Sequence, residues 1–282
     1  MPQLTDNIHT LIFLHIPRTG GSTLRWILRR QFQADETLAV VKGYDPWAEI
    51  AALPQPRRMQ IKYVRGHVSY GIHQYFTHPA AYITFMRDPV DHIISHHYYV
   101  LRLPTHYLHQ AVVSDTMSLK DYVTSGLSNE LTNDQTRRIS GLLTTKELTE
   151  QSLALAKANI ETHFAFVGLM ERYDESLVLA RRLFGWHNVY YVRKNVTKAR
   201  RSKQDVRQDV LDTIARRNQL DIELYQFVQQ RFNETIEAYG PTFQAAVARF
   251  QALNALFRAL YTGYKTMLAP LHSVRGRLRR VR

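Results

Sequence analysis

Two short segments of the sequence combine arginine with small polar residues in patterns that can bind anions. The first is HIPRTGGST, residues 15–23, and its candidate binding positions are Arg18, Thr19, Gly20, Gly21, Ser22 and Thr23. Backbone N–H groups of a glycine turn at a helix start can point at phosphate oxygens, where the helix dipole favours negative charge. The Arg18 guanidinium and the hydroxyl groups add further donors. A glycine turn without any ligand is the simpler alternative.

The second segment is FMRDPVDHIISHHYY, residues 85–99. Arg87 directly follows a predicted strand, at the strand end where α/β proteins place their ligands. Ser95 comes two helical turns later and can face the same anion. Taken alone, Arg87 and Asp88 could instead form an ordinary helix start, with Ser95 on the surface.

Alternating apolar runs predict the strands and helices that position these segments. Strands are predicted at residues 10–16, 60–65, 80–86, 164–169 and 189–192; helices are predicted after the glycine turn, after Pro89, and at residues 153–160, 174–184 and 205–239. Strands that alternate with helices favour a parallel sheet covered on both faces. We therefore predict an α/β fold, a three-layer parallel sheet flanked by helices with a P-loop-like nucleotide-binding start. The domain is placed at residues 1–240, followed by an amphipathic helical extension with a basic tail at 241–282.

The composition limits the chemistry and suggests the kind of partner. Among 282 residues there is no cysteine, which excludes disulfides, thiolate catalysis and cysteine-ligated metals. The formal net charge of +13 predicts anionic partners: phosphate esters, acidic or sulfated sugars, nucleic acid or an anionic membrane. No nucleic-acid-binding module is recognisable, so a specific nucleic-acid partner is not expected.

Together, the glycine loop and the R-D-P…S-H-Y-Y stretch resemble the two phosphosulfate-binding motifs of sulfotransferases that use 3′-phosphoadenosine 5′-phosphosulfate (PAPS). The nearest branch is the carbohydrate type that contains the heparan and uronyl 2-O-sulfotransferases. Further segments at residues 66–70, 133–138, 167–172 and 193–197 fit the same pattern in the same order. The resemblance implies the sulfotransferase fold and in-line transfer of a sulfuryl group from PAPS, as co-substrate, to a hydroxyl acceptor. A carbohydrate is the expected acceptor, and the basic charge favours an acidic one.

The resemblance also gives individual residues their expected roles. Residues 18–23 would bind the 5′-phosphosulfate, with Arg18 neutralising charge as the sulfuryl group leaves; the family usually has lysine there. Arg87 and Ser95 would bind the 3′-phosphate. Arg193, Lys194 and Asn195 would begin a loop that closes over the nucleotide. His67, in a G-H-V segment like that of the 2-O-sulfotransferases, would be the general base, a role that suits a neutral imidazole.

Other functions remain open at this stage. A nucleotide-dependent kinase would share the strand–loop–helix start, but the G-x-x-x-x-G-K-[ST] pattern and an evident magnesium carboxylate are lacking. A peptide tyrosine is an alternative acceptor. The histidine pairs His96–His97 and His106–His109 suggest a metal site, yet no carboxylate stands at a partnering spacing nearby, so no metal is expected.

The C-terminal stretch suggests a peripheral contact. Apolar residues between Leu253 and Tyr261 precede a basic tail from Tyr264 to Arg282 that has no acidic residue. Such a stretch can bind an anionic membrane or polysaccharide, can pack on a second copy, or can be a solvated terminus. The oligomeric state is therefore left open. No signal peptide or membrane-spanning run is predicted, which favours a cytoplasmic location, with membrane association through the tail as an alternative.

Overall fold

The computed structural model of the chain describes residues 7–40, 46–66, 68–193 and 203–278. Its centre is a sheet of five parallel strands in the order β2-β3-β1-β4-β5. The strands are β1 (Thr10–Phe13), β2 (Thr37–Val40), β3 (Tyr63–Gly66), β4 (Ala80–Met86) and β5 (Phe164–Leu169). Because all strands run the same way, their carboxyl ends meet at one edge of the sheet. The predicted α/β class with a helix-flanked parallel sheet is confirmed.

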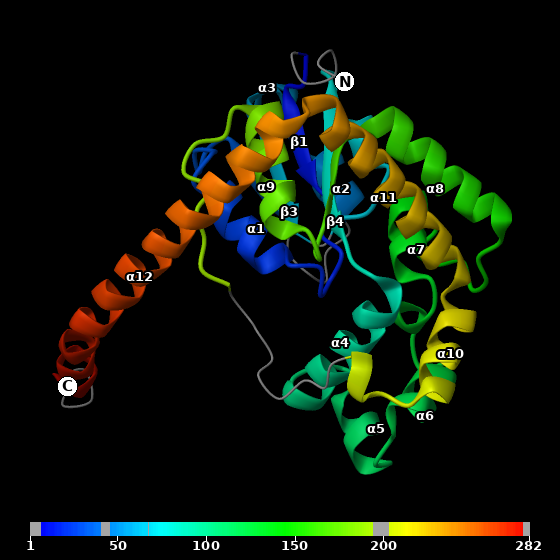
Figure 1. The fold of residues 1–282 in the computed structure, drawn as a ribbon. Helices are drawn as coiled ribbons and strands as arrows, with labels where there is room; N and C mark the ends of the chain where they lie inside the picture. Colours follow the sequence, from blue (N-terminus) through cyan, green and yellow to red (C-terminus); the bar gives the residue numbers. More distant parts are fainter. Residues whose placement is uncertain (1–6, 41–45, 67, 194–202, 279–282) are drawn as a thin grey trace.

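Helices cover both faces of the sheet (Figure 1). α1 and α9 lie with α12 on one side, and α8 and α11 lie on the other. Their bounds are α1 (Gly21–Leu28), α8 (Glu150–His163), α9 (Tyr173–Phe184), α11 (Gln219–Tyr239) and α12 (Pro241–Leu278). Two short helices, α2 (Pro46–Ala51) and α3 (Gln55–Gln60), lead from β2 to β3.

A second group of helices lies beyond the carboxyl edge of the sheet (Figure 1). It contains α4 (Pro89–Arg102), α5 (His109–Ser114), α6 (Leu119–Thr124), α7 (Asp134–Ser140) and α10 (Gln208–Arg217). The chain also forms short 3-10 helices at Ile72–Tyr75, Asn129–Leu131 and Lys203–Asp205. A separate small apolar cluster joins α4, α6 and α10. α4 follows β4 directly, so this group forms one wall of the region into which the strand ends point.

The strands predicted at 10–16 and 60–65 are present with other bounds, Thr10–Phe13 and Tyr63–Gly66, and Gln60 instead ends α3. Two further differences concern whole strands. The edge strand β2 (Thr37–Val40) was not predicted. The predicted strand at 189–192 is irregular chain in the structure. Val189 and Tyr191 are buried, which gives the period-two pattern of a strand. However, the backbone there bonds to side chains: Arg30 donates to the oxygens of Asn188 and Tyr190, and the Tyr191 N–H donates to Asn254.

α12 begins as part of the main core and then leaves it. Phe243, Val247 and Phe250 are buried in the same core cluster as the sheet. Further along, the helix projects beyond the rest of the molecule (Figure 1). Among the described residues, no helix combines the length and apolarity that a bilayer crossing requires.

Candidate active site at the carboxyl edge of the sheet

The loop between β1 and α1 turns sharply before the helix starts. Arg18 has φ 68° and Gly20 has φ 85°, both in the left-handed region. Gly20 caps α1, and its carbonyl oxygen accepts hydrogen bonds from the N–H groups of Thr23 and Leu24 and from the Tyr173 hydroxyl. A non-glycine residue such as Arg18 rarely adopts this conformation, and such backbone is found mostly where function or packing requires it.

Glycine is required at both middle positions of the loop because other side chains press against it. A Cβ atom on Gly21 would lie 2.1 Å from the His15 ring, and one on Gly20 would lie 2.7 Å from the Met170 sulfur. The Thr19 hydroxyl donates to the Ile16 carbonyl oxygen at 2.8 Å, and Thr19 is buried. The side chain of Thr19 therefore braces the turn, while Ser22 is half-buried at the helix start.

Arg18 connects the two predicted anion-binding segments. Its Nε donates to the Ser95 hydroxyl at 3.2 Å, and its guanidinium lies over the Tyr99 ring, 4.6 Å from the centroid. Arg87 reaches back from the end of β4, and its Nη1 donates to the Arg18 carbonyl oxygen at 3.0 Å. The structure therefore brings Arg18 together with Arg87 and Ser95, at the strand end where the sequence places the two arginines. The sequence pairs Ser95 with Arg87 and does not predict its contact with Arg18.

Arg87 and Asp88 are fixed by residues from distant parts of the chain. The Gln135 side chain accepts from the Arg87 N–H at 3.0 Å and donates to the Arg87 carbonyl oxygen at 2.8 Å. Glu171 accepts from the Asp88 N–H at 3.0 Å and from the Tyr225 hydroxyl at 2.6 Å. The sequence singled out 133–138 and 167–172 without assigning such roles. Their order relative to the arginine segments was the only available signal.

A buried carboxylate orients α7, the helix that provides Gln135. Asp221 accepts from the N–H groups of Gln135 and Thr136 at 3.1 and 2.7 Å. Next to it, the Asn133 side chain accepts from the Asp221 N–H, and the Asn133 N–H donates to Asn218. Burial raises the pKa of Asp221 to about 6, although the two backbone N–H groups oppose the shift. This arrangement satisfies the otherwise unpaired amides of the helix start.

His92 holds the loop between β1 and α1 through a hydrogen bond. It is buried, and its Nε2 lies 2.8 Å from the Pro17 carbonyl oxygen, directly before Arg18. A carbonyl oxygen only accepts hydrogen bonds, so Nε2 must donate. Burial lowers the pKa of His92 to about 3. His92 is therefore a neutral donor that fixes the position of the turn.

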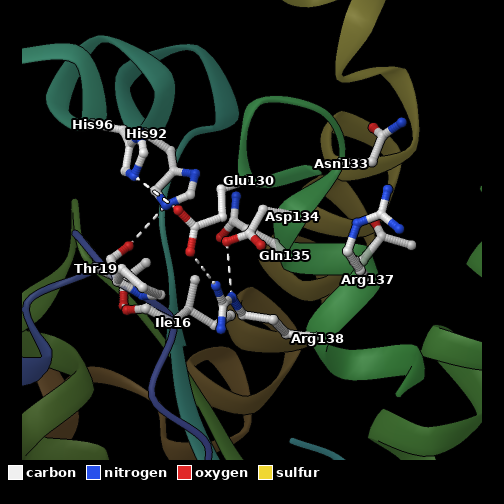
Figure 2. Close-up of polar contacts among 12 residues, drawn as sticks. Ile16, Thr19, His92, His96, Glu130, Asn133, Asp134, Gln135, Arg137 and Arg138 are labelled. Carbon is white, nitrogen blue, oxygen red and sulfur yellow. Dashed lines mark hydrogen bonds and ion pairs between the residues drawn. The ribbon is translucent and has the colours of Figure 1, made fainter. Parts of the chain in front are cut away.

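His96 lies one turn after His92 on the same face of α4 and belongs to a polar cluster there (Figure 2). Its Nε2 lies 3.4 Å from Glu130, and Glu130 also pairs with Arg138 at 3.1 Å and accepts from the Tyr107 hydroxyl. Arg138 pairs in turn with Asp134 at 2.9 Å. Burial would raise the pKa of Glu130, but the hydrogen bond and charge of His96, together with Arg138, lower it to about 2.

The same cluster contains the partnering carboxylate that the sequence did not reveal. Ligand atoms of His96, His106 and Glu130 lie within 4.8 Å of one another. Glu130 reaches them through the fold from a turn that lies more than twenty residues after His106 in the chain. Since Arg138 and Tyr107 already bond to Glu130, the cluster forms an ion-pair network between α4 and α7.

Three predicted site residues lie outside the described residues: His67, Lys194 and Asn195. His67 follows Gly66, the last residue of β3, and β3 is the neighbour of β1 in the sheet. Arg193, the last described residue before the gap, is exposed, and it lowers the pKa of Tyr191 against the larger effect of burial. Tyr191 packs edge-on against Tyr173, whose hydroxyl bonds to Gly20.

The parallel sheet, the glycine turn at a helix start and the two arginines at one edge define an α/β enzyme that handles an anionic group. Compared with family models, the chain matches galactose-3-O-sulfotransferase over residues 2–277 and therefore belongs to this family. It is an enzyme of the sulfotransferase class that acts on carbohydrate, as the sequence resemblance predicts. The family model is described by galactose O-3, whereas the motifs had placed the chain nearest the 2-O branch. A search of curated proteins gave no match.

Proposed function

We propose that the protein transfers the sulfuryl group of PAPS to a carbohydrate hydroxyl, with His67 as the general base. The observation that supports this most directly is the contact between the two anion-binding segments. The Arg18 Nε lies 3.2 Å from the Ser95 hydroxyl, and the Arg87 Nη1 lies 3.0 Å from the Arg18 carbonyl oxygen. A donor with phosphate groups at both ends of a nucleoside needs two cationic positions that are close but distinct, which is what these residues offer.

The donor would be divided between these positions. The backbone of Thr19 and Gly20, together with the first turn of α1 formed by Gly21, Ser22 and Thr23, would receive the 5′-phosphosulfate, because helix-start amides favour anions. Arg87 and Ser95 would bind the 3′-phosphate through charge-assisted hydrogen bonds. Arg193, with Lys194 and Asn195, would then cover the nucleotide from the side of Tyr173.

The transfer itself exchanges one sulfur–oxygen bond for another. The acceptor oxygen forms a bond to sulfur while the bond from sulfur to the 5′-phosphate oxygen breaks, and 3′-phosphoadenosine 5′-phosphate leaves. The proton of the acceptor hydroxyl passes to the His67 imidazole. Arg18 stabilises the negative charge that develops on the leaving phosphate oxygen. No metal ion is needed for this charge balance, since the arginines supply the positive charge.

The acceptor follows from the family. The family description names the 3-hydroxyl of galactose, so we propose a galactosyl residue as the sulfated sugar. The net charge of +13 favours an acceptor that is itself acidic.

Radiolabelled sulfate transfer from PAPS to galactosides tests this proposal. We expect label in a galactoside with a free 3-hydroxyl and none in its 3-deoxy counterpart. Binding of 3′-phosphoadenosine 5′-phosphate and of ATP, measured by calorimetry at physiological salt, tests the donor site separately. Saturable binding of the bisphosphate with much weaker binding of ATP is expected. Preferential ATP binding would favour the kinase alternative and contradict the proposal.

A further inference from the structure

The outer part of α12 exposes a row of apolar side chains. Leu253, Leu256, Leu260 and Tyr264 are 39%, 58%, 65% and 62% exposed, and together we call them the apolar ridge. The aromatic residues of the same stretch lie on the adjoining side of the helix, where Phe257 and Tyr261 pack on Trp26 of α1 with ring centroids 6.1 and 6.0 Å apart. The ridge therefore remains exposed beside the side of the helix that is anchored to the body.

The ridge continues a basic cavity along the same face of the helix. Positions 249, 253, 256, 260 and 264 are spaced by three or four residues, so they form one stripe. At the start of this stripe, Arg249 and Leu253 line a cavity between α12 and α9 with Arg181, Arg182 and Tyr190. This cavity lies along α9, away from Tyr173, the residue of that helix that contacts Gly20. It is thus separate from the candidate active site.

The arginines of this cavity differ in how they are held. Arg182 donates to the Thr242 carbonyl oxygen and lies over the rings of Tyr239 and Phe243, so it fastens the start of α12. Arg181 and Arg249 are exposed and line the same cavity. Among the described residues, the lining contains three arginines and no aspartate or glutamate, so the charge of the cavity is suited to a phosphate-bearing group.

Charge distinguishes the occupants that such a face can take. From residue 241 to residue 282 the sequence contains lysine and arginine but no aspartate or glutamate. A second copy would bring a helix of the same sign against it, which electrostatic repulsion opposes. An acidic polysaccharide would satisfy the charge but not the exposed leucines. An anionic bilayer meets both requirements, because basic side chains attract its headgroups while apolar side chains enter the acyl boundary.

We propose that α12 docks the protein on an anionic membrane surface, with a lipid phosphate at Arg181 and Arg249 and the apolar ridge at the acyl boundary. The interaction is peripheral and reversible. It is independent of the sulfotransferase proposal, since it uses no residue of the carboxyl edge of the sheet.

Co-sedimentation of the full chain with lipid vesicles tests this. We expect binding to vesicles that contain phosphatidylglycerol, little binding to phosphatidylcholine alone, and weakening by salt. Leu256→Ser with Leu260→Ser should lower partitioning roughly ten-fold or more. Arg181→Ala with Arg249→Ala should lower it roughly ten-fold. Leu155→Ser, at a leucine 42% exposed on α8, and Arg102→Ala, at the end of α4, serve as controls and should bind normally.

Three results would overturn the proposal. The first is a chain that remains in solution with both vesicle types. The second is binding that the two leucine substitutions leave unchanged, which would indicate adsorption through charge alone. The third is a dimer in sedimentation velocity that the leucine substitutions dissociate, which would assign the ridge to a second copy. Circular dichroism of each variant shows whether the fold is retained, and the exposed positions chosen should not disturb it.

Discussion

The Gln135 side chain pairs with the backbone of Arg87 through both of its polar atoms, at 3.0 and 2.8 Å, as a neighbouring strand would. β4 ends at Met86, so this amide extends its hydrogen bonding by one residue. The side chain of Arg87 leaves the sheet at that residue. The direction of the guanidinium toward Arg18 therefore depends on a residue 48 positions later in the chain.

Gln135→Met keeps the length of the side chain and removes both bonds to Arg87. Gln135 is completely buried, so the Arg87 N–H and carbonyl would be left without this partner. We expect the free energy of unfolding to fall by roughly 1–3 kcal/mol, and binding of 3′-phosphoadenosine 5′-phosphate to weaken. Gln208→Met removes an exposed amide on α10 and should change neither quantity. Urea unfolding and calorimetry measure both; an unchanged affinity would separate Gln135 from the positioning of Arg87.

Arg87→Ala tests the predicted site for the 3′-phosphate directly. Removal of a guanidinium that bonds to a phosphate should weaken binding of the bisphosphate by roughly 1.5–3 kcal/mol. Adenosine 5′-phosphosulfate, which has no 3′-phosphate, should lose much less affinity. Arg102→Ala, at the exposed end of the same helix that follows Arg87, is the matched control. Equal loss for both nucleotides would place the 3′-phosphate elsewhere.

His67→Ala tests the general base. We expect turnover to fall roughly 10²–10⁴-fold, while binding of the bisphosphate persists, because the base acts on the acceptor hydroxyl. His187→Ala is a suitable control: His187 is exposed, and its bonds to Gln31 come from its backbone. Normal turnover in the His67 variant would remove this residue from the mechanism.

Local sequence predicts an element correctly where the backbone forms the hydrogen bonds that the apolar pattern implies. The bounds predicted for β4 and β5 agree with the structure, because these strands are apolar and end at residues of clear type. The segment at 189–192 has the same alternation, yet Arg30 and Asn254 take up its backbone groups. Such bonds come from residues far away in the chain, so a local pattern cannot reveal them.

In the candidate site, too, local sequence places some residues correctly and cannot place others. Arg18, Arg87 and Ser95 could be placed at one edge because each follows a recognisable strand or helix start. The roles of Asp221 and Glu171 could not be predicted from the sequence. Asp221 accepts from an N–H group of α7, and Glu171 accepts from the N–H group of Asp88. Only the packing of α11 and of the end of β5 brings these groups together. Resemblance indicated that the segments belong together, and the structure supplies the bonds that join them.

Gly21→Ala tests the packing of the glycine turn. The added Cβ would meet the His15 ring at 2.1 Å, so the ring or the helix start must move. We expect lower stability and weaker bisphosphate binding, and His15→Ala in the same chain should restore part of both by removing the ring. Gly263→Ala meets nothing within 4 Å in α12 and should be neutral or stabilise by up to about 1 kcal/mol. Full additivity of the Gly21 and His15 substitutions would contradict this account.

Two buried histidines make stability depend on pH in a direction that can be worked out. Burial lowers the pKa of His92 to about 3 and that of His97 to about 4, whereas an unfolded histidine titrates near 6.5. Below about pH 6.5 the unfolded chain therefore binds more protons, and the free energy of unfolding should fall by about 1.4 kcal/mol per pH unit for each histidine. Asp221, whose pKa burial raises to about 6, acts in the opposite sense below that pH, so the comparison must be made against a variant.

His92→Gln can still donate to Pro17 but does not titrate. Between pH 6.5 and 5 the free energy of unfolding of this variant, measured with urea, should fall less steeply than that of the unsubstituted chain. The difference between the two slopes should correspond to about one bound proton, or about 1.4 kcal/mol per pH unit. Identical slopes would mean that His92 is not buried in its neutral form.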